Sequence, residues 1–129
     1  HPANYNGALQ TVVACRAEAE EEFTAKVKEA GGRAMKLRVS GMFHCPELQP
    51  ESQEFEKFLR TLTMNAPRMD VYANLTAQPY EGDFAVTLAK QMCSPVRFTE
   101  TVANMKARGV EEFVEVGPGK VLTGLVQRG

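Results

Sequence analysis

The stretch RVSGMFHCPELQPESQEFEKFLRTL, residues 38–62, contains the transition on which the interpretation of the fold depends. Just before it, RAMKLRV (33–39) alternates apolar and basic residues with the period of a strand that has one polar face. After a Ser-Gly turn, residues 50–62 carry apolar side chains at helical spacing. This stripe consists of Phe55, Phe58, Leu59 and Leu62. A strand, a turn and a helix in succession predict one unit of α/β structure.

The same alternation continues on both sides of this stretch. The patterns predict strands over 9–15, 69–76 and 111–116, and helices over 16–32, 82–92, 96–109 and 120–128. Ser94-Pro95 has the residue types of an N-cap followed by the first residue of a helix. Alternating strands and helices favour an α/β fold in which the strands from residue 69 onward are parallel.

Composition excludes several classes of protein. The 129 residues, 43% hydrophobic and 24% charged, suffice for one domain with a core. The net charge is -1 and the basic residues are spread out, so we expect neither a nucleic-acid partner nor a membrane surface. No apolar run approaches the roughly 20 residues that span a bilayer. Three cysteines without metal-ligand spacing, at positions 15, 45 and 93, predict a cytoplasmic protein with no metal site.

His44 is the first candidate for chemistry. It follows the end of a predicted strand, which is where open α/β sheets place functional residues, and histidine exchanges protons readily near neutral pH. Position alone leaves two interpretations open: a catalytic base, or a turn residue with ordinary hydrogen bonds. No G-x-S-x-G sequence occurs, and Cys45 is a poor partner because neighbouring side chains in extended backbone point apart. A nucleophile for His44 would therefore come from outside these residues.

Two further segments also have alternative interpretations. EVGPGKVL (115–122) lacks the spacing of a phosphate-binding loop, because Val121 follows Lys120 where Ser or Thr is required. A tight strand-to-helix turn explains its glycines better, and an anion site at the helix start is the alternative. Asn4 and Asn6 alternate along extended backbone, so their amides either bind a ligand or satisfy the local backbone.

Five segments together carry a resemblance to a known family. ANYN, VSGMFH, VYANLTAQP, QMCSPVRF and VEVGPGKVLTGL occur in the order and spacing seen in malonyl-CoA:acyl carrier protein transacylases and in related acyltransferase domains of fatty acid and polyketide synthases. The resemblance covers essentially the whole chain and implies the C-terminal portion of such an enzyme. The implied fold is an α/β-hydrolase-like large subdomain with an inserted ferredoxin-like small subdomain. Residues 1–39 resemble the later half of the small subdomain, and residues 40–129 the C-terminal part of the large one.

The resemblance implies an S-malonyltransferase of fatty acid or polyketide biosynthesis, within lipid metabolism. Such enzymes move a malonyl group from coenzyme A to the phosphopantetheine thiol of acyl carrier protein through an acyl-serine, and here the serine lies outside the chain. His44 matches the catalytic base, and Gln91 the residue whose backbone carbonyl orients it. The implied substrate-binding set consists of Asn4, Asn6, Gln10 and Phe43. The aromatic side chain is associated with selection of malonyl over α-branched groups.

The implied partners are malonyl-CoA, acyl carrier protein and the missing N-terminal portion of the enzyme, with no cofactor beyond the substrates. The stretch Gly7-Ala8-Leu9 departs from the family's Ser-Pro-Gly beside Gln10. Without a serine and oxyanion donors, the chain by itself is expected to be inactive. A non-catalytic module that binds carrier protein is one alternative, and an esterase-like hydrolase using the same dyad is another. The basic rim expected in the first of these comprises Lys26, Lys28, Arg33, Lys36 and Arg38.

Overall fold

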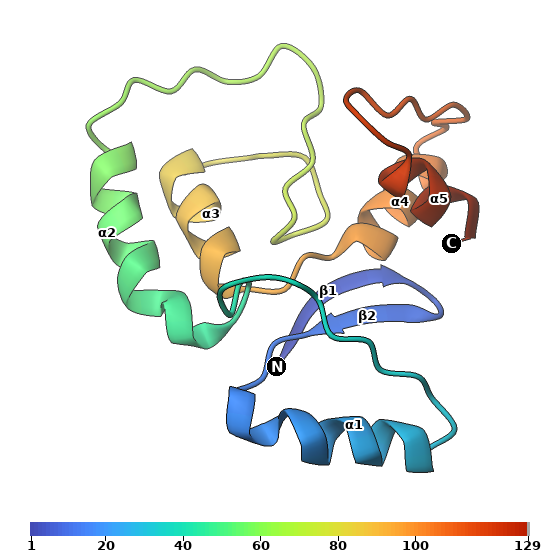
Figure 1. Cartoon of the computed structure of the whole chain (residues 1–129). Helices are drawn as coiled ribbons and strands as arrows, with labels where there is room; N and C mark the ends of the chain where they lie inside the picture. The colour runs from blue at the N-terminus through green and yellow to red at the C-terminus, as the bar shows by residue number, and fades with distance from the viewer. Residues whose placement is uncertain (129) are drawn as a thin grey trace.

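The structure is a computed structural model, and it describes residues 1–128. The strands are β1 (Pro2–Gly7) and β2 (Gln10–Val13), and the helices are α1 (Glu20–Glu29), α2 (Gln49–Leu59), α3 (Phe84–Lys90), α4 (Phe98–Ala107) and α5 (Val121–Arg128). Three short 3-10 helices are η1 (Ala17–Ala19), η2 (Pro46–Leu48) and η3 (Gln91–Cys93). Figure 1 shows α2 and α3 side by side at one end, the two strands in the middle with α1 below them, and α4 and α5 at the other end.

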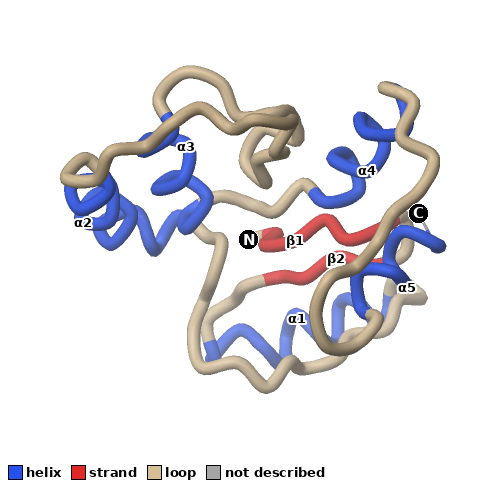
Figure 2. The backbone as a smooth tube through the Cα atoms, turned by 90° about the horizontal axis from the view of Figure 1, so that it is seen from above, coloured by secondary structure: helices blue, strands red, loops and turns tan. Residues whose placement is uncertain are grey.

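The two strands form an antiparallel hairpin, and β1 has a neighbour on each edge. On its second edge, the Val96 N–H donates to Ala3 O and the Tyr5 N–H donates to Val96 O, each at 2.8 Å. The segment before α4 runs alongside β1 in Figure 2. The expectation that Ser94-Pro95 caps a helix is therefore wrong: α4 begins at Phe98, because this segment is extended and hydrogen-bonds to β1.

Helices α2 and α3 pack through small residues. Ala85 and Ala89 of α3 are buried against Leu59 of α2, which is 6% exposed. The buried Ser52 hydroxyl of α2 donates to Ala89 O at 2.7 Å. This bond and the close alanine contact fix the C-terminal end of α3 relative to α2.

A tight loop over residues 72–79 (the 72–79 loop) precedes α3. An antiparallel bridge joins Tyr72 to Pro79, and the Ala73 N–H donates to Gln78 O at 2.9 Å. Ala73 and Ala77 are almost fully buried, and Ala77 has a φ of 56°, in the left-handed region. Short backbone bonds and buried small side chains leave this loop little freedom, so it provides a rigid reference point for its neighbours.

The helices predicted from the sequence are confirmed, and so is the strand predicted over 9–15, which is β2. The strands predicted over 33–39, 69–76 and 111–116 are wrong, as is the parallel sheet expected from residue 69 onward. The one sheet among residues 1–128 has two antiparallel strands. A strand requires a partner for its backbone groups, and these three segments find none within the described chain apart from isolated bridges.

The unpaired segments leave apolar side chains exposed. Met35 and Val39, on one face of the predicted strand 33–39, are 66% and 62% exposed. Val114 and Val116, in the segment 111–116, are 75% and 95% exposed. Alternating apolar residues that should face a core therefore face solvent in this chain. None of the helices within residues 1–128 is long and apolar enough to cross a membrane.

Candidate active site around His44

His44 lies in a strained turn between the extended segment 33–39 and η2. Its φ of 58° is in the left-handed region, which non-glycine residues seldom adopt and which occurs preferentially at functional sites. The turn is held by the Cys45 thiol, which donates to Met42 O at 3.1 Å, and burial raises the pKa of that thiol. The Phe43 ring covers Gly41, where an added Cβ would lie 3.3 Å from the ring. The Phe43 ring against Gly41 and the hydrogen bond from Cys45 to Met42 O hold the turn in this strained geometry.

Two carbonyl groups at the end of α3 hold His44. The Nδ1 atom lies 2.8 Å from Gln91 O, and the backbone N–H donates to Met92 O at 3.1 Å. Both carbonyls belong to η3, where the helix ends and its last carbonyl groups lack helical partners. Because a carbonyl oxygen only accepts, this contact requires a proton on Nδ1, and in the neutral tautomer the lone pair is then on Nε2. The residue as a whole is half-buried.

The side chain of Gln91 has a separate partner. Its Oε1 accepts a hydrogen bond of 2.7 Å from the Asn74 N–H, in the 72–79 loop. Sequence analysis assigned only the backbone carbonyl of Gln91 and missed both this bond and Asn74. The segment VYANLTAQP could have indicated the loop, since it contains Asn74, but nothing in its pattern reveals a contact 17 residues away.

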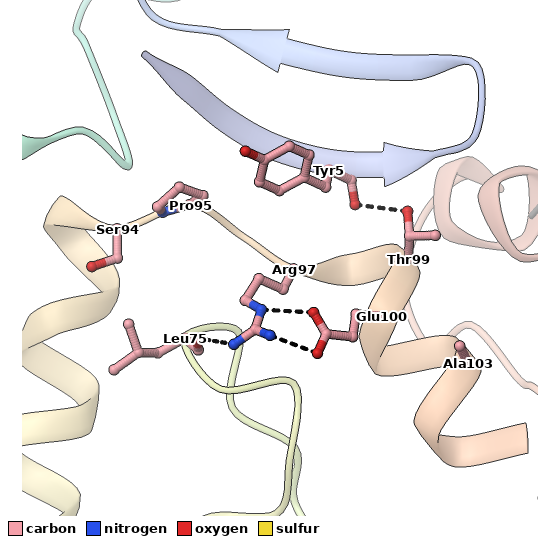
Figure 3. A pocket seen from close by; sticks show the side chains of 8 residues that line it. All are labelled: Tyr5, Leu75, Ser94, Pro95, Arg97, Thr99, Glu100 and Ala103. Carbon is pink, nitrogen blue, oxygen red and sulfur yellow. Dashed lines mark hydrogen bonds and ion pairs between the residues drawn. The ribbon is translucent and has the colours of Figure 1, made fainter. Parts of the chain in front are cut away.

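A hollow of about 520 Å³ in volume does not have His44 among its lining residues. Figure 3 shows the residues that line it: Tyr5, Leu75, Ser94, Pro95, Arg97, Thr99, Glu100 and Ala103. The Arg97 guanidinium pairs with both carboxylate oxygens of Glu100 and donates to Leu75 O at 3.2 Å. Arg97 thus uses its charge within the chain and is hydrogen-bonded to the 72–79 loop.

The predicted substrate-binding residues fall into two groups. Phe43 is 54% exposed and directly precedes His44. Asn4 and Asn6 lie in β1 and are half-buried, and neither amide forms a hydrogen bond within residues 1–128. Gln10 is exposed at the start of β2. The structure places Asn4 beside Val96, five residues after Gln91, so β1 adjoins the segment that leaves the His44 site.

The amides at the start of α5 are occupied by the chain itself. The Glu115 carboxylate accepts from the N–H groups of Leu122 and Thr123 at 3.1 and 2.9 Å, and from the Thr123 hydroxyl at 2.8 Å. The bonds from Thr123 and Leu122 lower the pKa of Glu115. The alternative of an external anion at this helix start is therefore wrong for these two amides, and Gly117 and Gly119, both at positive φ, form a tight turn before the helix.

Within the part of the chain that the structure describes, no group of three or more His, Cys, Asp or Glu side chains could hold a metal ion. Two of the five cations of the predicted basic rim are paired inside the chain, Lys26 with Glu22 and Lys36 with Glu20. The pairing lowers the pKa of Glu22 and raises that of Lys36. The rim is therefore less positive than its sequence indicates.

The chain matches no protein-family model, but individual proteins match it closely. It is 40% identical over 130 residues to the malonyl CoA-acyl carrier protein transacylase of Escherichia coli K12, covering 98% of this chain and 42% of that protein. The crystal structure of the corresponding transacylase from Clostridium perfringens matches with a TM-score of 0.94 at 36% identity, covering 99% of this chain and 41% of that one. A malonyl-transacylase in complex with a type II polyketide synthase acyl-carrier protein matches with a TM-score of 0.92 at 35% identity, over 98% of this chain and 42% of that one.

The backbone is thus that of part of an acyltransferase domain. Among acyltransferases, the homologues are the malonyl-CoA:acyl carrier protein transacylases, and the resemblance seen in the sequence is confirmed. The chain spans about two-fifths of the length of these relatives, 42% of the Escherichia coli protein, and a C-terminal placement fits that share.

Proposed function

We propose that this chain is the part of a malonyl-CoA:acyl carrier protein S-malonyltransferase that supplies the catalytic base. The observation that carries the proposal is the His44 geometry, in which Nδ1 donates to Gln91 O at 2.8 Å and Nε2 is left as proton acceptor. His44 is the base and the Gln91 carbonyl orients it. The division of the chain into small-subdomain residues 1–39 and large-subdomain residues 40–129 is part of the same proposal.

In the proposed reaction, Nε2 of His44 removes the proton from a serine hydroxyl as that oxygen attacks the malonyl thioester. The carbon–sulfur bond breaks, and the imidazolium returns the proton to the coenzyme A thiolate. The acyl-serine is then attacked by the phosphopantetheine thiol of acyl carrier protein, with His44 again taking and returning the proton. A carbonyl acceptor on Nδ1 keeps the ring in the tautomer that both half-reactions require.

The serine is proposed to come from the remaining portion of the enzyme. The unpaired segments support this partner, because Val39, Val114 and Val116 are each more than half exposed and their backbones lack sheet partners within residues 1–128. Strands that form only in the presence of a second portion would bring that portion against the turn that carries His44. His44 is half-buried, so part of the residue remains exposed in this chain.

The substrate contacts in this proposal come from the hairpin and from the His44 turn. Asn4, Asn6 and Gln10 hold acyl-CoA through their side-chain amides. Phe43 crowds groups larger than malonyl, at about 1–3 kcal/mol of discrimination for one steric contact. Acyl carrier protein is the proposed acceptor, as in the related complex of a malonyl-transacylase with a polyketide synthase carrier protein.

The test uses a chimaera in which this chain replaces the matching segment of the Escherichia coli transacylase. We expect the chimaera to transfer malonyl from coenzyme A to acyl carrier protein, and His44→Ala to reduce the rate at least about 10³-fold, because groups of a catalytic dyad act as a unit. His1→Ala, at the other histidine, is the matched control and should leave the rate unchanged. A folded His44→Ala chimaera with the parent rate would refute the proposal.

A further inference from the structure

The orienting carbonyl of Gln91 belongs to the backbone, so every residue type at position 91 could provide it. The side chain at this position is nevertheless engaged, with Oε1 accepting from the Asn74 N–H at 2.7 Å. One residue therefore bonds to His44 through its carbonyl and to the 72–79 loop through its amide. These two bonds link the catalytic base to a loop that does not touch it directly.

The position of Gln91 makes this link useful. It lies where α3 gives way to η3, and helix ends fray because their last carbonyl groups lack helical partners. A frayed end would let the carbonyl group rotate away from Nδ1. The bond to Asn74 opposes this rotation, because it ties the side chain of the same residue to a fixed point.

The 72–79 loop is such a fixed point. Its backbone bonds and its buried alanines hold it from within, and Arg97 holds it from outside. The Arg97 N–H donates to Asn74 O at 3.2 Å, and its guanidinium donates to Leu75 O at 3.2 Å while paired with Glu100 (Figure 3). Both backbone groups of Asn74 are therefore engaged: its N–H donates to Gln91 Oε1, and its carbonyl oxygen accepts from the Arg97 N–H.

We propose that the side-chain amide of Gln91 is a positioning group for His44, which locks the orienting carbonyl to the 72–79 loop. This inference rests on the proposed function and deepens it. The amide does not touch substrate and transfers no proton. Its effect is to keep Nδ1 hydrogen-bonded and Nε2 correctly aimed during the reaction.

The test compares variants of residue 91 in the chimaera, all of which keep the backbone carbonyl. Gln91→Leu is apolar and cannot accept from Asn74, and Gln91→Asn, which has the shape of leucine, stays polar but is one methylene too short. We expect each to lower kcat about 10- to 100-fold with KM for malonyl-CoA unchanged, since small displacements of a catalytic group have effects of this size. Gln91→Glu retains an acceptor of full length and should restore most of the rate.

Asn104→Leu is the matched control. The Asn104 amide donates to Ala77 O at 2.8 Å, so this variant removes a side-chain bond to the same loop without touching Gln91. We expect Asn104→Leu to lose about as much thermal stability as Gln91→Leu does, but to keep the kcat of the parent. A spectroscopic readout is independent of turnover: the Nδ1 proton of His44, assigned by its absence in His44→Ala, should exchange slowly in the parent and in Asn104→Leu, and rapidly in Gln91→Leu.

The outcomes separate this inference from the proposed function. If His44→Ala abolishes transfer while Gln91→Leu and Gln91→Asn both keep the parent kcat and a slowly exchanging Nδ1 proton, the positioning role is refuted and the function stands. If Asn104→Leu lowers kcat as much as Gln91→Leu does, the effect is general loop stability and the inference is also refuted. If His44→Ala retains activity, the proposed function is refuted, and the positioning role that rests on it is refuted as well.

Discussion

Substituting Val114 and Val116 by alanine should have very different effects in this chain and in the chimaera that completes it. The two side chains are 75% and 95% exposed, so the isolated chain gains little stability from them. Each Val→Ala change removes two methyl groups, each worth about 0.8 kcal/mol when fully buried. From the buried fractions, we expect the double variant to lose about 0.5 kcal/mol in the chain by itself and about 3 kcal/mol in the chimaera, where the strand is covered.

The measurement is the free energy of unfolding from urea titrations followed by circular dichroism. Leu59→Ala in the chimaera provides the reference for a core position that this chain already buries, since Leu59 is 6% exposed and packs on Ala85 and Ala89. Its loss should lie near the lower part of the 2–5 kcal/mol range, about 3 kcal/mol. A loss of about 0.5 kcal/mol or less from the valine pair in a chimaera that unfolds cooperatively would refute the argument that these residues face a second portion of the enzyme.

Two further predictions concern titratable groups outside the His44 site. Because hydrogen bonds lower the pKa of Glu115 in the folded chain, its stabilising effect is complete above the ordinary glutamate pKa of about 4.3 and is lost as the pH falls through the lower folded value. Glu115→Gln should therefore reduce the urea midpoint of the chimaera at pH 7, and this reduction should shrink as the pH falls through the lowered pKa of Glu115; a reduction that does not shrink at acidic pH would contradict this sign. Cys45 is fully buried, and burial raises the pKa of its thiol. Iodoacetamide at neutral pH should therefore modify Cys45 more slowly than the half-buried Cys15 and Cys93, as followed by mass spectrometry. Modification of Cys45 before the other two would contradict the described packing.

Local patterns were sufficient for the helices and for one strand. The stripe of Phe55, Phe58, Leu59 and Leu62 predicts α2 because helix periodicity and hydrogen bonding are both internal to one segment. The residues of the His44 turn were also identified from sequence, through their order relative to four other segments of the resemblance. The roles assigned to them remain predictions, as does the cytoplasmic location.

Pairing could not be predicted in the same way. Residues 33–39 and 111–116 have strand-like alternation, but a strand exists only when other backbone groups face it, and this chain contains no partner for them among the residues described. Ser94-Pro95 has the composition of a helix start, yet bonding of Val96 to β1 makes the segment extended. For Ser94-Pro95 a contact distant in sequence overrode the local preference, whereas for residues 33–39 and 111–116 the distant contact that a strand requires is missing among the described residues.

The amino-acid sequence by itself determined where the chain can form helices, and it placed a lone histidine between an extended segment and a helix. The resemblance already implied that the Gln91 carbonyl orients this histidine, but only the tertiary structure decided that the Gln91 amide meets Asn74 and that Glu115 occupies the start of α5. The reason is physical: helix formation depends on bonds four residues apart, whereas the Gln91 contacts join segments brought together by the packing of α2 on α3 and by the closed 72–79 loop, and the Glu115 contact depends on how the glycine turn before α5 folds back.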